Sequence, residues 1–144
     1  MEIEDILFSK SDAIDVSDPL SASLMLLEKA SHIGEVVEKK NVLETDGPGK
    51  RLKMEFDVVR RYDDYSQFRI NVSMSAEIDE KKTLEIDMEG SVTTKIEEEG
   101  FFSSVFAEFY LQGLYERTTA LSKKGLEEAR KDMESSIAAL AKRA

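Results

Sequence analysis

Three segments between Leu52 and Ile96 alternate apolar and polar residues with a period of two. This alternation predicts β-strands with one buried and one solvated face, because successive side chains of a strand point to opposite faces. In the first strand, Lys53, Glu55 and Asp57 are expected to face solvent. The expected inward positions are Leu52, Met54, Phe56 and Val58, then Phe68, Ile70, Val72, Met74, Ala76 and Ile78, then Leu84, Ile86, Met88, Gly90, Val92, Thr94 and Ile96.

The connections between these strands are short and polar, at Asp63–Ser66 and Asp79–Lys82. They fit hairpins and leave no room for a crossover helix, so the strands are predicted to be antiparallel neighbours in a meander. Gly90 falls on the inward-facing register. A glycine there predicts a bend, a bulge or the close approach of another element.

The C-terminal part predicts helix, since no proline occurs from Ser103 to Arg143 and apolar residues recur at spacings of three and four. Ser103 or Ser104 is a plausible N-cap. Gly125 follows two lysines, a combination typical of a helix end. We therefore expect two helices with a break at Gly125. The apolar positions are Phe102, Val105, Phe106, Phe109 and Gly113, then Leu126, Ala129, Met133, Ile137 and Leu140.

The N-terminal third predicts a helix from Pro19 to Ser31, because aspartate suits the cap and proline the first helical position. Leu20, Leu24 and Leu27 form an apolar stripe along it. Before this helix, Ile3, Ile6 and Phe8 are compatible with a short strand. The segment 33–43 is either a continuing helix or an extra strand, and 45–51 is a turn-rich loop.

These elements predict one α+β domain over residues 1–144. Its antiparallel β-meander has three long strands, or four if the N-terminal segment joins it as a strand, and it is packed on one face by an N-terminal helix and a long C-terminal helical segment. The expected order is β-α-β-β-β-α-α. In outline this is similar to helix-grip and TATA-binding-like folds, and a long-stranded meander followed by helices also resembles SecB-type export chaperones. The resemblance implies a fold and no functional residue.

The amino-acid composition limits the classes of partner that this chain is expected to bind. The chain has 30 acidic and 20 basic residues, a formal charge of -10, so its average field repels nucleic acid and anionic membranes. With no cysteine, disulfides, thiol nucleophiles and cysteine metal sites are excluded. The N-terminus has no signal-peptide pattern, and no apolar run approaches a membrane span. The chain is predicted to be soluble and cytoplasmic, with neither nucleic acid nor membrane as a partner.

The sequence contains no recognisable catalytic constellation. The single histidine, His32, is expected at a helix end or on the surface. The loop 46–50 lacks the order of a phosphate-binding loop, since Lys50 is followed by arginine and a strand. The acidic clusters are expected to serve solubility and turn formation, and the cluster 60–62 to be a hairpin end. No cofactor, metal or catalytic residue is predicted. The acidic clusters are Asp63-Asp64, Asp79-Glu80 and Glu97-Glu98-Glu99.

Aromatic residues are concentrated between Phe101 and Tyr115, and one methionine lies on the inward face of each long strand. They are compatible with a core, with a pocket for apolar ligands, or with a dimer interface or peptide groove. The leading hypothesis is a non-enzymatic domain that binds a hydrophobic small molecule, protein or peptide. The alternative is a homodimer formed through the aromatic helix, and the least favoured is a carboxylate or metal-dependent enzyme. The candidate binding residues are Met54, Met74, Met88, Phe102, Phe106, Phe109 and Tyr110.

Overall fold

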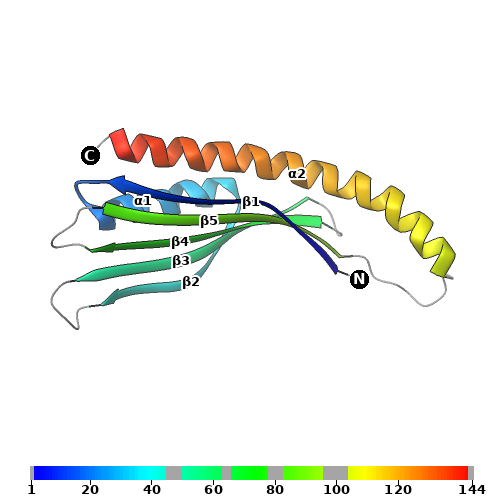
Figure 1. The fold of residues 1–144 in the computed structure, drawn as a ribbon, viewed down its shortest axis with the longest axis horizontal. Helices are drawn as coiled ribbons and strands as arrows, with labels where there is room; N and C mark the ends of the chain where they lie inside the picture. Colours follow the sequence, from blue (N-terminus) through cyan, green and yellow to red (C-terminus); the bar gives the residue numbers. More distant parts are fainter. Residues whose placement is uncertain (1, 45–49, 63–65, 78–82, 96–103, 143–144) are drawn as a thin grey trace.

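The computed structural model describes residues 2–44, 50–62, 66–77, 83–95 and 104–142, and the side chains of helix α2 from Ala120 to Leu140. It has five strands and two helices (Figure 1). In chain order these are β1 (Glu2–Asp15), α1 (Pro19–Ile33), β2 (Glu35–Glu44), β3 (Arg51–Arg61), β4 (Ser66–Glu77), β5 (Thr83–Lys95) and α2 (Ser104–Lys142).

The strands form one antiparallel sheet in the order β1-β5-β4-β3-β2. α1 contacts chiefly β2 and β3, whereas α2 contacts β4, β5 and β1. The two helices also contact each other and together cover the inner face. Figure 1 shows α2 beginning past one end of the sheet and then running back along it. The predicted α+β meander is confirmed, with five strands instead of three or four.

The predicted inward register is confirmed for the described residues of β3, β4 and β5. Met54 lies opposite Met74, and Met74 lies opposite Ile86. Every described inward position is buried, because both helices pack on this face. Ile78 and Ile96 lie outside the described residues. The same is true of most of the two predicted turns.

Residues 35–44 form the edge strand β2, which decides between the two alternatives for this segment. α1 ends at Ile33, and Gly34 donates its N–H to the Ala30 carbonyl. A Cβ at Gly34 would lie 2.7 Å from the carbonyl oxygen of Val59, so glycine permits the close turn into the sheet. β1 is the opposite edge strand and is longer than the short strand predicted.

α1 begins as predicted: Pro19 occupies the first turn, and Asp18 accepts a hydrogen bond from the Ser21 N–H at 3.3 Å. The predicted stripe is not the buried face, however, since Leu20 and Leu24 are 40% and 47% exposed. The face that is buried instead carries mainly small side chains, which let the helix approach the sheet closely. Close packing therefore decides which face of α1 is buried, and the number of leucines on a face does not. The buried residues of α1 are Pro19, Ala22, Ser23, Leu26 and Ala30.

The predicted break at Gly125 is wrong, because α2 is one continuous helix. Gly125 is buried beside Tyr62, and a Cβ there would overlap the Tyr62 hydroxyl and ring. The glycine therefore permits close contact between helix and sheet and does not end the helix. Towards the C-terminus the predicted apolar stripe is confirmed: Leu126, Ala129, Met133, Ile137 and Leu140 are all buried.

Gly90 marks a close approach, one of the predicted alternatives. The ring of Phe8 from β1 lies where a Gly90 side chain would be. The register between β1 and β5 shifts between Ile6 and Phe8, and Phe8 is the Cα partner of Gly90. A bulge thus directs this aromatic ring into the inner layer, where it is 7% exposed.

Candidate functional site

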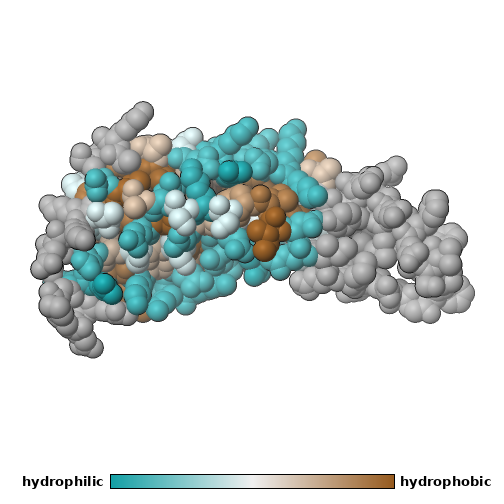
Figure 2. Space-filling model, viewed as in Figure 1, coloured by the Kyte–Doolittle hydropathy of each residue, from teal (hydrophilic) through white to brown (hydrophobic). Residues whose placement is uncertain are grey.

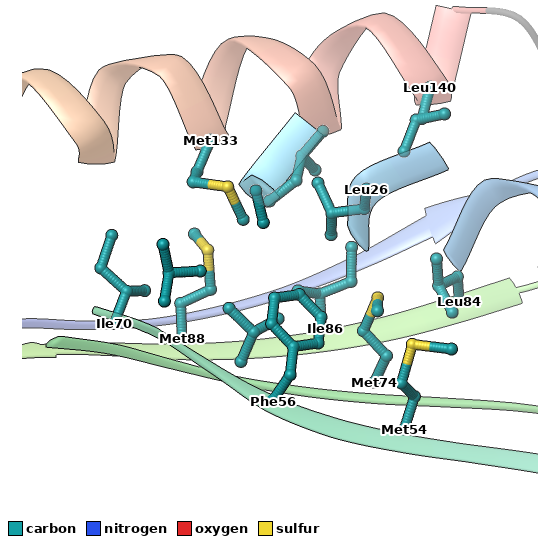
Figure 3. Close-up of a cluster of buried hydrophobic side chains, with 14 of the residues drawn as sticks. Leu26, Met54, Phe56, Ile70, Met74, Leu84, Ile86, Met88, Met133 and Leu140 are labelled. Atoms are coloured by element: carbon teal, nitrogen blue, oxygen red, sulfur yellow. The ribbon is translucent and has the colours of Figure 1, made fainter. Parts of the chain in front are cut away.

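The three candidate methionines lie in the packed core. Met54, Met74 and Met88 are each 2% exposed and belong to one cluster with Leu26 and Met133. Figure 3 shows side chains from the strands and from both helices converging there. The structure therefore brings the methionines of three strands together as part of the contact between sheet and helices.

The aromatic candidates lie in or near the N-terminal half of α2. Phe106, Phe109 and Tyr110 are within the helix, although their side chains are outside the described set, as is the whole of Phe102. The N-terminal end of α2 extends past the end of the sheet (Figure 1). Between Phe101 and Tyr115 only Glu108 is charged, in a chain with 35% charged residues. Residues 104–115, the aromatic segment of α2, thus form a nearly uncharged stretch of helix at this end.

A groove opens between α1 and α2, at the rim of the apolar inner layer. The volume of this α1–α2 groove is about 270 Å³. A separate depression of about 410 Å³, lined mainly by polar residues, lies at one end of β3, β4 and β5. Met25 and Leu26 form one wall of the α1–α2 groove, and Ala139 and Leu140 form the other. Lys29, Ser135 and Ser136 complete its lining. An apolar floor with few polar groups is typical of small-ligand sites.

The outer face of the sheet carries a buried acid that the alternation placed in solvent. Asp57 is only 2% exposed. Its carboxylate lies 3.1 Å from Lys39 Nζ and 3.6 Å from an Arg69 nitrogen, and it accepts a hydrogen bond from Asn71 at 2.8 Å. The Asn71 amide also donates to Glu55 at 3.1 Å. Asp57 therefore joins β2, β3 and β4. Hydrophilic residues make up most of the described surface in the view of Figure 2, with smaller apolar patches between them.

Nothing in the sequence distinguished Asp57 from its neighbours, because it has the same period-two position as Lys53 and Glu55. We expect Asp57→Ala to lower the free energy of unfolding by about 1–3 kcal/mol, since it removes a buried acceptor of charged and polar donors. Urea denaturation measures this loss. Glu89→Ala, an exposed acid on β5, is the control and is expected to change stability by less than about 0.5 kcal/mol. Equal effects would contradict a special role for Asp57.

A second polar cluster joins β1 to α2. Glu134 accepts a hydrogen bond from Arg130 at 3.1 Å and lies 3.4 Å from Lys10 Nζ, and the Arg130 guanidinium is 4.9 Å from the centre of the Phe8 ring. The Arg130 hydrogen bond, followed by the charge of Lys10, lowers the pKa of the Glu134 carboxyl below its usual value despite partial desolvation. This cluster covers Phe8 and fixes the edge strand to the helix.

The lowered pKa of Glu134 gives stability a pH dependence with a defined sign. A depressed carboxyl pKa stabilises the folded state above the ordinary value of about 4.3, and the contribution is lost as pH falls through the folded-state pKa. Glu134→Gln is therefore expected to be less stable than the parent at pH 7 and to approach it in acid. Thermal denaturation of parent and variant at pH values from 7 into the acid range tests this expectation, with Glu128→Gln as an exposed control. A difference that persists unchanged in acid would contradict this assignment.

The other side chains considered in the sequence do not meet in a common site among the described residues. His32 is exposed in the last turn of α1. Tyr62 packs on Phe68 with 5.9 Å between ring centres, and the Arg60 guanidinium lies 5.1 Å from the Tyr62 ring centre. The described residues contain no group of three or more His, Asp or Glu suited to a metal. The acidic clusters at 63–64, 79–80 and 97–99 lie outside the described ranges.

Comparison with known proteins finds no family model that matches the chain, and no curated protein matches it. Neither helix is both long and apolar enough to cross a membrane, as judged over the described residues.

Proposed function

We propose that this chain is a non-enzymatic binding domain that holds an apolar group in the α1–α2 groove. The observation that carries the proposal is this opening of about 270 Å³ between Met25 and Leu26 on one side and Ala139 and Leu140 on the other. Its size is near the lower end for ligand pockets. It suits one hydrophobic peptide side chain or a short acyl chain better than a large cofactor.

Lys29 is the only charged residue among those described in the groove lining. The Ser136 hydroxyl donates to the Asp132 carbonyl at 2.9 Å, so it is engaged within its own helix. We therefore assign to Lys29 the role of binding a negatively charged end of the ligand. An acyl carboxylate combines the apolar chain and negative group that this lining would recognise.

Ligand titration followed by NMR tests the proposal with medium-chain carboxylates and hydrophobic peptides. Ala139→Trp should fill the groove and weaken binding at least tenfold. Ala138→Trp is the matched control, because Ala138 is exposed and is not among the groove residues. Lys29→Glu should weaken binding of the carboxylate and leave the alcohol of equal chain length unaffected. No saturable binding, or equal effects of the two tryptophans, would reject the proposal.

A second candidate function is assembly of a homodimer through the aromatic segment of α2, residues 104–115. Its support is the extension of this nearly uncharged segment beyond the sheet (Figure 1). Aromatic side chains are enriched at protein–protein interfaces, so a helix segment of this composition is suited to pairing with a second copy. Phe106→Lys combined with Phe109→Lys should then convert a dimer to a monomer in light scattering, whereas an unchanged mass would reject this interface.

A further inference from the structure

The β2 edge of the sheet is the starting point for a second interaction surface. β2 pairs with β3 along one side and has no described strand on the other (Figure 1). Seven large apolar side chains are exposed among the described residues, and five of them belong to β2 or α1. These five are Leu20, Leu24, Val37, Val42 and Leu43. The exposed apolar surface is therefore concentrated at one end of the strand order.

The exposed leucines of α1 lie on the side of the helix away from α2. Met25 and Lys29 line the groove toward α2. With 3.6 residues per turn, Leu20 and Leu24 are roughly 140° around the helix from these two residues. Because α1 contacts β2 and β3 while α2 contacts β4, β5 and β1, this side of α1 lies toward β2. The helix and edge strand thus provide two adjoining layers of apolar surface.

The bulge in β2 makes this edge self-complementary. The register shifts between Glu38 and Lys40, so Val37 and Val42 both lie opposite outward residues of β3 while Val36 and Leu43 lie opposite inward ones. If two β2 strands pair antiparallel with Val37 opposite Val42, each outward apolar residue meets another and Val36 meets Leu43. Cross-strand apolar pairs of this kind stabilise sheets. Because a two-fold axis would relate the two copies, each of these apolar pairs occurs twice, once on either side of the axis.

The centre of this pairing contains lysines whose charge is partly offset by acids of the same chain. Lys39 lies 3.1 Å from the buried Asp57, which also has an Arg69 nitrogen at 3.6 Å, and Lys40 is the register partner of Glu55. Each copy therefore contributes three basic and two acidic groups near the centre. The edge is about 33 Å long. With a helix layer behind it, this length is compatible with the roughly 800 Å² per partner of a standard stable interface.

We propose that two copies of this chain pair through antiparallel β2 strands, forming one continuous sheet with five strands from each copy. The apolar sides of the two α1 helices then meet across the inner face. This proposal goes beyond the binding function and uses different residues from the groove. The competing reading is that Lys39, Lys40 and the bulge protect the edge from pairing, and it predicts a monomer.

Cysteine cross-linking tests the register directly, because the natural chain has no cysteine. Val37→Cys together with Val42→Cys should give a covalent dimer on oxidation, since opposite residues lie within disulfide reach. Val37→Cys alone should not, because the two copies of this residue would be about 17 Å apart along the strands. Cross-linking of the single variant equal to that of the double variant would overturn the register.

The mass of the 144-residue chain in solution provides the second test. We expect a dimer at micromolar concentration by light scattering, and at least a tenfold weaker dimer for Val37→Lys combined with Val42→Lys. Ile6→Lys and Leu121→Lys are the controls, because they change exposed apolar residues away from β2 and α1. Circular dichroism verifies folding. A monomeric parent would overturn the proposal, even if its β2 edge paired with an added extended peptide. A parent dimer that the two lysine substitutions in β2 leave unchanged would overturn it as well. Ligand titration of the monomeric variant tests the groove separately.

Discussion

Met88→Ala is expected to lower the free energy of unfolding by about 2–5 kcal/mol, the usual cost of truncating a buried large apolar side chain. Met88 is 2% exposed and points toward the helix layer (Figure 3). Its loss removes contacts and leaves a cavity between β5 and α2. Urea denaturation with fluorescence or circular dichroism measures the change.

The result also distinguishes a packed core from a pre-existing pocket. If Met88 lined an open pocket, its truncation would cost less than about 1 kcal/mol, because few packing contacts would be lost. Met25→Ala is the matched control, since Met25 is a partly buried methionine in the groove lining. It should cost clearly less than Met88→Ala. Equal costs would contradict the difference in packing between the core and the groove.

Gly125→Ala is expected to destabilise the protein by about 1–3 kcal/mol, through overpacking against Tyr62. The sign is informative, because alanine normally stabilises a helix interior over glycine by about 1 kcal/mol. Here the new Cβ overlaps the Tyr62 hydroxyl and ring, and the ring can move only by losing its contacts with Phe68 and Arg60. Thermal and urea denaturation report the effect.

A double-mutant cycle gives this prediction its control. In a Tyr62→Ala background the obstruction is absent, so Gly125→Ala should become stabilising. Ala138→Gly, at an exposed position of the same helix, calibrates helix propensity and should cost about 1 kcal/mol. Failure of the sign to reverse would show that Tyr62 is not what requires glycine at position 125.

The sheet was predictable because its signal is local. Alternation in β4 directly determines that Phe68, Ile70 and Val72 share one face. The helix start at Asp18 and Pro19 is likewise a property of adjacent residues. Gly90 was informative for the same reason: its position in the alternation indicated a missing inward side chain, although not that Phe8 would occupy the space.

The errors arise where tertiary contacts decide. Gly125 satisfies the rules for a helix end, and only the position of Tyr62 shows that it permits close packing instead. The leucine stripe of α1 is exposed because small residues on another face fit the sheet more closely. Asp57 required knowledge that Lys39, Arg69 and Asn71 converge on it. The groove depends on the separation of two helices and has no sequence motif.

The pairing of β1 with β5 has a consequence for how the chain folds. Glu2 is the register partner of Lys95, so the first strand joins the last across almost the whole sheet-forming sequence. The β3-β4-β5 meander needs only short loop closures, whereas the β1–β5 ladder must close a much longer loop. Such non-local pairing slows folding. We therefore expect the meander to form in the folding transition state and β1 to join afterwards, which would give Ala substitutions at Phe8 low φ-values and those at Val72 high ones.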